Sequence, residues 1–273
     1  MDNLYKKLIT YSYNILGSYE DAKDLVQDTI EKYISLDKSH IQSESNFLIK
    51  SVINHSINFK KRNSKVSKFG VWLPEPLNTE SPDIKIIKEH TANYSLLVLM
   101  EKLNPKERAV FILKEGFDYA HDEIAIALEI SSENSRQLFS RAKRSLGSAT
   151  FNMSPAKLDN LKVYVDAIIK GEVKKLEKLL TEDIRVFADG GNKVKVIKDL
   201  ILGRKETMKV LLFVYNNFQH NLKCILRAVN HEPAICFYDH DKLIYCQIFK
   251  FSGEKISDVY AIIDSNKLKN LSG

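Results

Sequence analysis

Apolar residues recur every three or four positions through the first sixty residues of the chain. Two such stripes of large side chains can be traced: Leu25, Val26, Ile30, Tyr33 and Ile34; and Phe47, Leu48, Val52, Ile53 and Ile57. Each stripe occupies one face of an amphipathic helix at this spacing. The pattern therefore predicts a small helical bundle from Leu4 to Asn63.

The helical pattern breaks from Ser64 to Asn93, where three prolines are scattered among polar residues. Connectors of this length are unusual inside a compact domain, which favours a linker between modules. The linker contains the stretch "GVWLPEPL", Gly70 to Leu77, with the only tryptophan of the chain, Trp72. Each proline keeps the residue before it extended. An indole ring in such a segment is expected to contact a partner surface.

Helical spacing resumes from Tyr94 to Leu146 and ends in "DEIAIALEI" and "SSENSRQLFSRAKRSLG", two helices joined by a short turn. On the second helix Leu138, Phe139, Ala142 and Leu146 share one face, and the opposite face holds Arg136, Gln137, Ser140, Arg141 and Arg144. This layout is typical of a helix-turn-helix, whose second helix reads the major groove. The alternative is a helical hairpin with a basic solvent-exposed face.

The last third of the chain changes character after Pro155. Helical stretches extend to Ile169 and then to Leu180, and a further one is expected near Lys205 to Asn217. After Asp183 strand-like runs dominate, the last four being "KCILRAV", "PAICFY", "LIYCQIFKF" and "ISDVYAII". Short turns separate these four runs, which predicts an antiparallel meander in an α+β domain.

Composition is that of a globular protein, with 44% hydrophobic residues in 273 residues and no apolar run long enough to span a membrane. The first residues lack the features of a signal peptide, and we expect a cytoplasmic protein. Cys224, Cys236 and Cys246 lack metal-binding spacing and are expected to be reduced and buried. No cofactor is expected.

The net charge of +6 is unevenly distributed. Lys60, Lys61, Arg62, Lys65 and Lys68 form one basic run, and the second helix of the helix-turn-helix holds another. Acids gather in Glu20, Asp21, Asp24, Asp28 and Glu31. This distribution indicates contact with nucleic acid on some faces and with a basic partner on another, although each run alone also fits an ordinary solvated helix face.

Two blocks resemble a known family. "LNPKERAVFILKEGFDYAHDEIAIALEISSENSRQLFSRAKRSL" resembles region four of extracytoplasmic-function sigma factors, and "LGSYEDAKDLVQDTIEKYI" with "NFLIKSVINHSINFKKR" resembles their region two. The resemblance covers about Leu4 to Gly147 and implies a bacterial sigma subunit. Its implied partners are core RNA polymerase, through the β′ clamp helices and the β flap, and promoter DNA.

The resemblance also implies roles for individual residues. Asp24, Gln27, Asp28 and Glu31, with Val26 between them, match the helix that contacts the clamp helices. Asn54, Asn58, Lys60, Lys61 and Arg62 match the segment that meets the minus-ten element, where cations and polar groups suit single-stranded DNA. The outward residues of the second helix match those that read the minus-thirty-five element. The sequence departs from the family pattern at Asn58 and Ser135.

The linker and the tail resemble one branch of this family, with a fused SnoaL-like domain of the nuclear-transport-factor-2 superfamily. Asp189, Gly190 and Gly191 match the acidic-Gly-Gly signature of the branch, and "VYAIIDSNKL" partly matches its closing motif. We hypothesise that Trp72, Leu73, Pro74, Glu75 and Pro76 form an interdomain latch on the tail near that signature. The tail would then regulate the factor in cis.

The expected fold is multidomain: two all-α sigma domains followed by an α+β, SnoaL-like cone-shaped barrel. The domains are sigma region two (1–63), the linker (64–93), sigma region four (94–150) and the regulatory domain (154–273). One alternative is a ligand-sensing DNA-binding regulator that acts without polymerase. Another is a SnoaL-like cyclase or isomerase, for which Asp189, His220, His231 and His240 are candidates, with the histidines expected on the surface. The sequence leaves open whether a small ligand enters the tail cavity.

Overall fold

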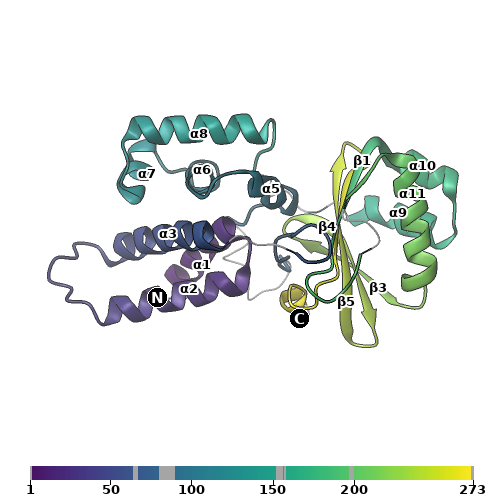
Figure 1. Cartoon of the computed structure of the whole chain (residues 1–273), viewed down its shortest axis with the longest axis horizontal. Helices are drawn as coiled ribbons and strands as arrows, with labels where there is room; N and C mark the ends of the chain where they lie inside the picture. The colour runs from purple at the N-terminus through teal and green to yellow at the C-terminus, as the bar shows by residue number, and fades with distance from the viewer. Residues whose placement is uncertain are drawn as a thin grey trace. The chain divides into compact units, whose positions relative to one another are not determined.

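The computed structural model describes residues 2–63, 67–79, 90–151, 156, 158–196 and 200–271 (Figure 1). The chain divides into two compact units. The helical unit comprises residues 1–64 and 82–153, and the C-terminal unit comprises residues 65–81 and 154–273. The linker segment around Trp72 therefore belongs with the C-terminal unit. The predicted boundaries at 64 and 154 lie outside the described residues, and so does the predicted basic residue Lys65.

The first part of the helical unit is a three-helix bundle of α1 (Asp2–Leu16), α2 (Tyr19–Ile34) and α3 (Glu44–Arg62). Ser18 and Ser43 are the N-cap residues of α2 and α3, and the hydroxyl of each accepts a hydrogen bond from a backbone N–H of the first turn. Most residues of the two predicted apolar stripes face the interior, where Val26, Val52 and Ile53 are fully buried, but Ile34, in the last turn of α2, is 66% exposed, contrary to the prediction. The predicted helical bundle is confirmed.

The second part of the helical unit contains α5 (Tyr94–Leu99), the 3₁₀ turn η2 (Met100–Lys102), α6 (Pro105–Phe111), the π-helical turn η3 (Ile112–Gly116), α7 (His121–Leu128) and α8 (Ser132–Leu146). Asn104 and Glu107 form a reciprocal capping box at the start of α6. Helix α8 packs against both α6 and α7. The last two helices form the predicted helix-turn-helix.

The C-terminal unit holds α9 (Leu158–Ile169), α10 (Val173–Leu179), α11 (Arg204–Val214), the π-helical turn η4 (Tyr215–Gln219) and the 3₁₀ turn η5 (Lys269–Leu271). Its strands are β1 (Leu180–Asp189), β2 (Leu200–Leu202), β3 (Lys223–Val229), β4 (Glu232–Asp239), β5 (Lys242–Ser252) and β6 (Lys255–Ile262). They form one mixed sheet of order β2-β1-β6-β5-β4-β3, with the helices on one face (Figure 1).

Strands β3 to β6 pair antiparallel in succession, as the sequence predicts, whereas β1 pairs parallel with β6. Strand β1 begins at Leu180, earlier than the strand expected after Asp183, because its first residues pair with Ile256 of β6. Residues of α9, α10, α11 and the sheet share one apolar core that includes Tyr164 and Phe249. The predicted α+β domain is confirmed.

The cysteine prediction is correct for two of the three residues. Cys236 and Cys246 are buried opposite each other on β4 and β5, with their sulfur atoms 3.8 Å apart. Cys224 is exposed, contrary to the prediction, because it stands near the solvated start of the edge strand β3. In the described part of the chain, no helix is long and apolar enough to cross a membrane.

Candidate nucleic-acid interface and linker site

Helix α8 separates its two faces completely. Leu138, Ala142 and Leu146 are buried. Five polar and basic side chains predicted to face DNA are exposed: Arg136, Gln137, Ser140, Arg141 and Arg144. Ser131 caps the helix by accepting the N–H of Asn134 at 3.1 Å. The result is a fixed helix whose outer face is basic and polar apart from Glu133 in its first turn, as groove binding requires.

Ser135 occupies the inner face of α8, where an apolar residue is usual in the family. The side chain is fully buried, and its hydroxyl hydrogen-bonds Nδ1 of His121 at 2.9 Å, across the turn of the helix-turn-helix. This bond satisfies both polar groups. Burial lowers the pKa of His121, and the Arg136 guanidinium lowers it further. The departure at Ser135 is thus compensated within the motif.

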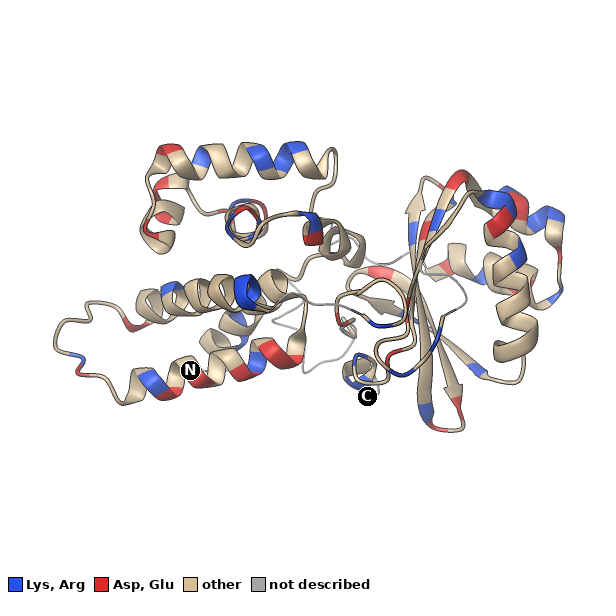
Figure 2. Ribbon diagram, viewed as in Figure 1, with Lys and Arg blue, Asp and Glu red and all other residues tan. Residues whose placement is uncertain are grey.

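Helix α2 presents the acidic face that the sequence predicts. Asp24, Gln27, Asp28 and Glu31 are exposed, while Val26 is fully buried. Figure 2 shows several red segments along α2 and blue segments along α8. Within the helical unit, acidic and basic side chains are therefore concentrated on different helices.

The predicted minus-ten residues of α3 divide into two groups. Asn58, Lys61 and Arg62 are exposed. Asn54 and Lys60 instead make contacts inside the helical unit. Nδ2 of Asn54 donates to the carbonyl of Ala127 in α7 at 2.9 Å, and Nζ of Lys60 reaches Glu101 of η2 at 3.0 Å.

Glu101 is the centre of a buried ionic cluster between α3 and α6. Its carboxylate pairs with Lys60 and with Arg108, whose side chain is fully buried. Nε of Arg108 also donates to the carbonyl of Asn14 in α1 at 2.7 Å. Burial alone would raise the pKa of Glu101, but Arg108 and Lys60 together hold it below its ordinary value. The cluster fastens α1 and α3 to α6.

The linker is paired with the C-terminal unit through its backbone. The N–H of Phe69 donates to the carbonyl of Gly191, that of Gly190 donates to Phe69, and that of Val71 donates to Ala188, over 2.8 to 3.0 Å. Gly70 lies between these bonds at φ +104, and a Cβ there would stand 2.0 Å from the Ala188 oxygen. Only glycine permits this approach.

Asp189 lies fully buried beneath the linker. One oxygen of its carboxylate accepts from the Ser67 hydroxyl at 2.8 Å and from the N–H of Gly191 at 2.9 Å. The other accepts from the N–H of Leu73 at 2.7 Å and from Nζ of Lys267. Four donors thus compensate a charge that could not otherwise be buried.

Lys267 joins the linker to the closing motif of the chain. Its ammonium pairs with Asp189, donates to the carbonyl of Leu73 at 2.5 Å and lies 4.5 Å from the centre of the half-buried Trp72 ring. Burial lowers the pKa of Lys267, and the Asp189 charge opposes that shift. The predicted latch residues Leu73, Pro74 and Pro76 are buried here, and Glu75 is half-buried.

The linker has a second attachment to the turn between β3 and β4. The N–H of Leu77 donates to Oδ1 of Asn230 at 2.7 Å, and the N–H of Asn230 donates back to the carbonyl of Leu77 at 3.0 Å. Thr79 accepts from the N–H of His231 at 3.4 Å. His231 is buried as a result, which corrects the prediction of a surface residue.

Sequence reasoning did not assign Lys267 and Asn230 to the linker site. The partial match of the closing motif was a signal for Lys267, whereas a lone asparagine in a turn gave none for Asn230. Of the other enzyme candidates, His220 and His240 are exposed. Within the described ranges, no cluster of three or more His, Cys, Asp or Glu residues could hold a metal ion.

Comparison with known proteins agrees with this geometry. Residues 94–146 match the family model of sigma-70, region 4. The extracytoplasmic-function RNA polymerase sigma factor SigJ of Mycobacterium tuberculosis is 24% identical over 220 residues, covering 77% of this chain and 70% of SigJ. The probable sigma factor SigI of the same organism is 22% identical and covers 97% of this chain and 92% of its own.

A solved structure extends the match to the whole fold. The crystal structure of M. tuberculosis SigJ superposes with a TM-score of 0.81 at 21% identity, over 98% of this chain and 97% of that one. The match spans the sigma helices and the sheet domain together. The chain thus contains a segment that matches sigma-70, region 4, is similar over most of its length to extracytoplasmic-function RNA polymerase sigma factors, and shares the fold of SigJ.

Proposed function

We propose that this sigma factor binds polymerase with α2, reads promoter DNA with α3 and α8, and is regulated in cis by its own C-terminal unit. Core RNA polymerase and promoter DNA are the partners that a sigma factor requires. The division of labour among helices, and the regulation, are what the proposal adds.

The polymerase contact is assigned to the exposed face of α2. Asp24, Asp28 and Glu31 point to solvent from a helix whose other face is fixed in the bundle. Such a rigid acidic stripe suits a basic helical partner and speeds the encounter between the two. We assign this partner to the β′ clamp helices, and region four to the β flap.

Promoter recognition is assigned to two surfaces. The arginines of α8 are placed to contact phosphates and base edges of the minus-thirty-five element in the major groove. Asn58, Lys61 and Arg62 are exposed at the end of α3 and would meet the melted minus-ten strand, where cations follow the backbone.

The contacts of Asn54 and Lys60 indicate that the free protein holds a closed helical unit. Both side chains would have to leave α7 and Glu101 before they could contact DNA. These bonds are made by side chains, so that DNA phosphates or bases can replace them. In our proposal, polymerase binding separates α3 from α6 and α7.

Regulation by the C-terminal unit rests on one observation, the enclosure of Asp189 by the linker. The chain leaves the helical unit after residue 64 and returns to it at residue 82. Anchoring its middle on Asp189 and Lys267 restrains both connections. The proposed domain organisation is therefore sigma two, anchored linker, sigma four and regulatory domain.

The test is transcription by core RNA polymerase with the full chain on promoters selected from genomic fragments. The parent should give transcripts with defined start sites. The double variant Asp24→Ala/Asp28→Ala should lose core binding, and Arg141→Ala should weaken promoter binding but retain core binding. The charge-matched controls are Asp166→Ala/Glu177→Ala, exposed on α9 and α10, for the double variant, and Lys174→Ala, exposed on α10, for Arg141→Ala. Equal core binding by the double variant and its control would refute the α2 assignment.

The regulatory part is tested with Lys267→Met, which keeps the length of the side chain but removes its charge. We expect the variant to bind core and to differ from the parent in transcript yield, with faster proteolysis between residues 67 and 79. Unchanged yield and unchanged proteolysis would contradict regulation through the linker.

A further inference from the structure

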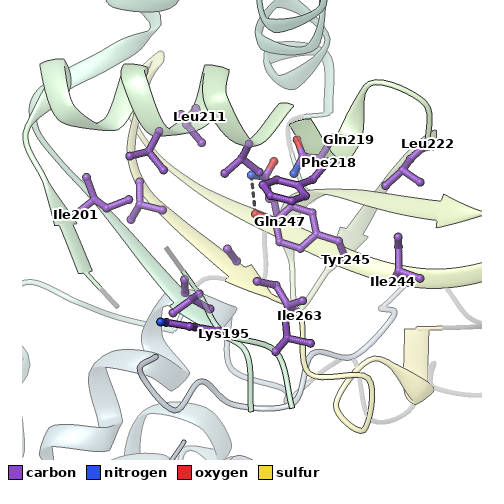
Figure 3. Close-up of a pocket in the computed structure, with 17 residues that line it drawn as sticks. Lys195, Ile201, Leu211, Phe218, Gln219, Leu222, Ile244, Tyr245, Gln247 and Ile263 are labelled. Carbon is purple, nitrogen blue, oxygen red and sulfur yellow. Dashed lines mark hydrogen bonds between the residues drawn. The ribbon is translucent and has the colours of Figure 1, made fainter. Parts of the chain in front are cut away.

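The C-terminal unit contains a cavity of about 240 Å³ between the sheet and α11, partly open to solvent where the exposed Phe218 lines it. Aliphatic side chains of the sheet and helix form its walls, among them Val186, Ala188, Ile201, Leu211 and Ala261 (Figure 3). The volume exceeds the ~150 Å³ of an engineered cavity that binds benzene and falls just below the range of about 300–1,000 Å³ for drug-sized ligands. A compound of one or two rings fits this space.

One end of the cavity is polar. Gln219, Gln247 and Tyr245 gather beneath the end of η4, as Figure 3 shows. Nε2 of Gln247 donates to the Tyr245 hydroxyl at 3.0 Å. Burial raises the pKa of Tyr245, and the nearby amides of Gln247 and Gln219 oppose that shift only in part, so the hydroxyl stays protonated at neutral pH.

The amide nitrogen of Gln219 is the donor at this polar end that a ligand could bind. The residue is only 5% exposed. Its amide lies near the Tyr245 hydroxyl, but Nε2 makes no hydrogen bond of full geometry with any described residue. A buried donor without an acceptor costs free energy that a bound acceptor would recover. The cavity therefore offers an oxygen acceptor a defined place at one end.

The charge of the walls restricts the ligand further. Among the described residues that line the cavity, Lys195 is the single charged side chain, and it is exposed. An ionised ligand would be desolvated against aliphatic walls without a buried counter-charge. The lining residues described include no aspartate, glutamate or histidine, so they supply no carboxylate or imidazole for proton transfer. The lining thus favours binding over turnover.

We propose that this cavity binds an uncharged, largely apolar small molecule of one or two rings whose single oxygen accepts a hydrogen bond from Gln219. No described residue of the helical unit lines the cavity. Binding therefore stands apart from the proposed function, and only its effect on transcription rests on that function.

The cavity and the linker share the same piece of backbone. Successive residues of a strand face opposite sides of the sheet, so that Ala188 lines the cavity while Asp189 holds the linker. Ile263 of the wall donates its N–H to the carbonyl of Asp189 at 2.8 Å. Val196 lines the cavity too, and its Cγ2 lies 3.3 Å from the place of a Cβ on Gly70. A ligand that moves these walls would also move the linker anchor.

Binding is tested by calorimetry on the full chain with three probes of one ring system: naphthalene, 2-naphthol and 2-naphthoate. The hydroxyl of 2-naphthol should improve affinity over naphthalene by about tenfold, the effect of one recovered hydrogen bond. The carboxylate of 2-naphthoate should weaken binding. This predicted order of affinities is tested with the parent protein alone. Failure of both neutral probes to bind up to their solubility limits would overturn the proposal.

Variants locate the site. Gln219→Leu should remove the preference for 2-naphthol while leaving naphthalene bound, and Val214→Phe should fill the cavity and weaken both probes. Val163→Phe is the matched control, because Val163 is 41% exposed on α9 and does not line the cavity. A preference that persists in Gln219→Leu would overturn the assigned acceptor contact.

The proposed coupling between the cavity and the linker is tested separately, by NMR spectroscopy. Trp72 is the only tryptophan of the chain, so its indole N–H gives a single resonance in a proton–nitrogen correlation spectrum. Saturation with 2-naphthol should shift that resonance in the parent and not in Val214→Phe. Probe binding without any shift would overturn the coupling. Neither measurement uses polymerase, so a failure here is distinct from a failure of the proposed function.

Discussion

The protein uses a buried ion pair in each of its two units, and the two pairs differ in what surrounds them. Asp189 and Lys267 lie among backbone bonds that join the linker to β1 and its turn. Glu101, Arg108 and Lys60 lie among side-chain bonds between α3, α6 and α1. The carboxylate of Asp189 is fully buried, whereas the side chain of Glu101 is 25% exposed.

The difference indicates how permanent each attachment is. Backbone pairing needs no particular side chain and is lost only when the linker leaves as a whole, so the ion pair there adds to an attachment that already exists. In the helical unit, the side chains of Lys60 and Asn54 bond to the carbonyls of Leu16 and Ala127. In our proposal, a DNA phosphate or base replaces these two bonds. We infer that the linker site is a permanent attachment, whereas the Glu101 cluster is a contact that can open.

The largest effect is expected from Asp189→Ala. Removing the carboxylate leaves Lys267 buried without its counter-charge and the N–H of Leu73 without its acceptor, which should lower the free energy of unfolding by about 3–5 kcal/mol. Denaturant unfolding followed by Trp72 fluorescence measures the loss. The control is Asp241→Ala, in an exposed turn. Equal unfolding midpoints for the two variants would show that Asp189 is no anchor.

A conservative variant refines the result. Asp189→Asn keeps an acceptor for the linker but not the charge opposite Lys267, so it should lose less stability than Asp189→Ala. If both variants lose the same free energy of unfolding, the hydrogen bonds from the linker to the carboxylate add no stability beyond that of the ion pair with Lys267.

A smaller effect is expected from Glu101→Ala, about 2 kcal/mol, because the charged hydrogen bonds of Glu101 are partly open to water. The helical unit should melt earlier, and amides at the end of α3 should exchange faster with solvent. Lys102→Ala, at an exposed neighbouring position, is the control. Unaltered amide exchange in α3 would contradict the role of this cluster as the contact that holds α3 against α6.

The same cluster predicts a dependence on pH. The folded state holds the pKa of Glu101 below the ordinary value of 4.5. Its contribution to stability is therefore present above that pH and is lost as the pH falls through the lower, folded-state pKa. Unfolding free energies at several pH values below about 5 should decline less steeply in Glu101→Gln than in the parent. Parallel pH profiles of the parent and Glu101→Gln would show that Glu101 is not the source of the pH dependence.

The smallest structural effect belongs to the exposed arginines of α8, which take part in neither attachment. Arg141→Ala should leave thermal stability unchanged and reduce the slope of log affinity for promoter DNA against log salt by about 0.9. Fluorescence anisotropy at several salt concentrations measures the slope, with Lys174→Ala as the control. An unchanged slope would remove Arg141 from the phosphate contacts.

Local patterns in the sequence were enough to find α8 and the meander. Helical periodicity separates Leu138 and Ala142 from the arginines, and alternating runs with short turns define β3 to β6, because both signals depend on near neighbours in the chain. The parallel pairing of β1 with β6 joins residues more than 70 positions apart, and no local pattern encodes it.

The sequence by itself determined the helix faces, the strands of the meander and the resemblance to extracytoplasmic-function sigma factors, since these depend on spacing and motif. Tertiary structure alone decided that Asn54 and Lys60 contact region four, that His231 is covered, and that Lys267 and Asn230 hold the linker. The reason is physical: a buried charge or amide is stable only beside a partner, and distant segments supply those partners when the chain folds.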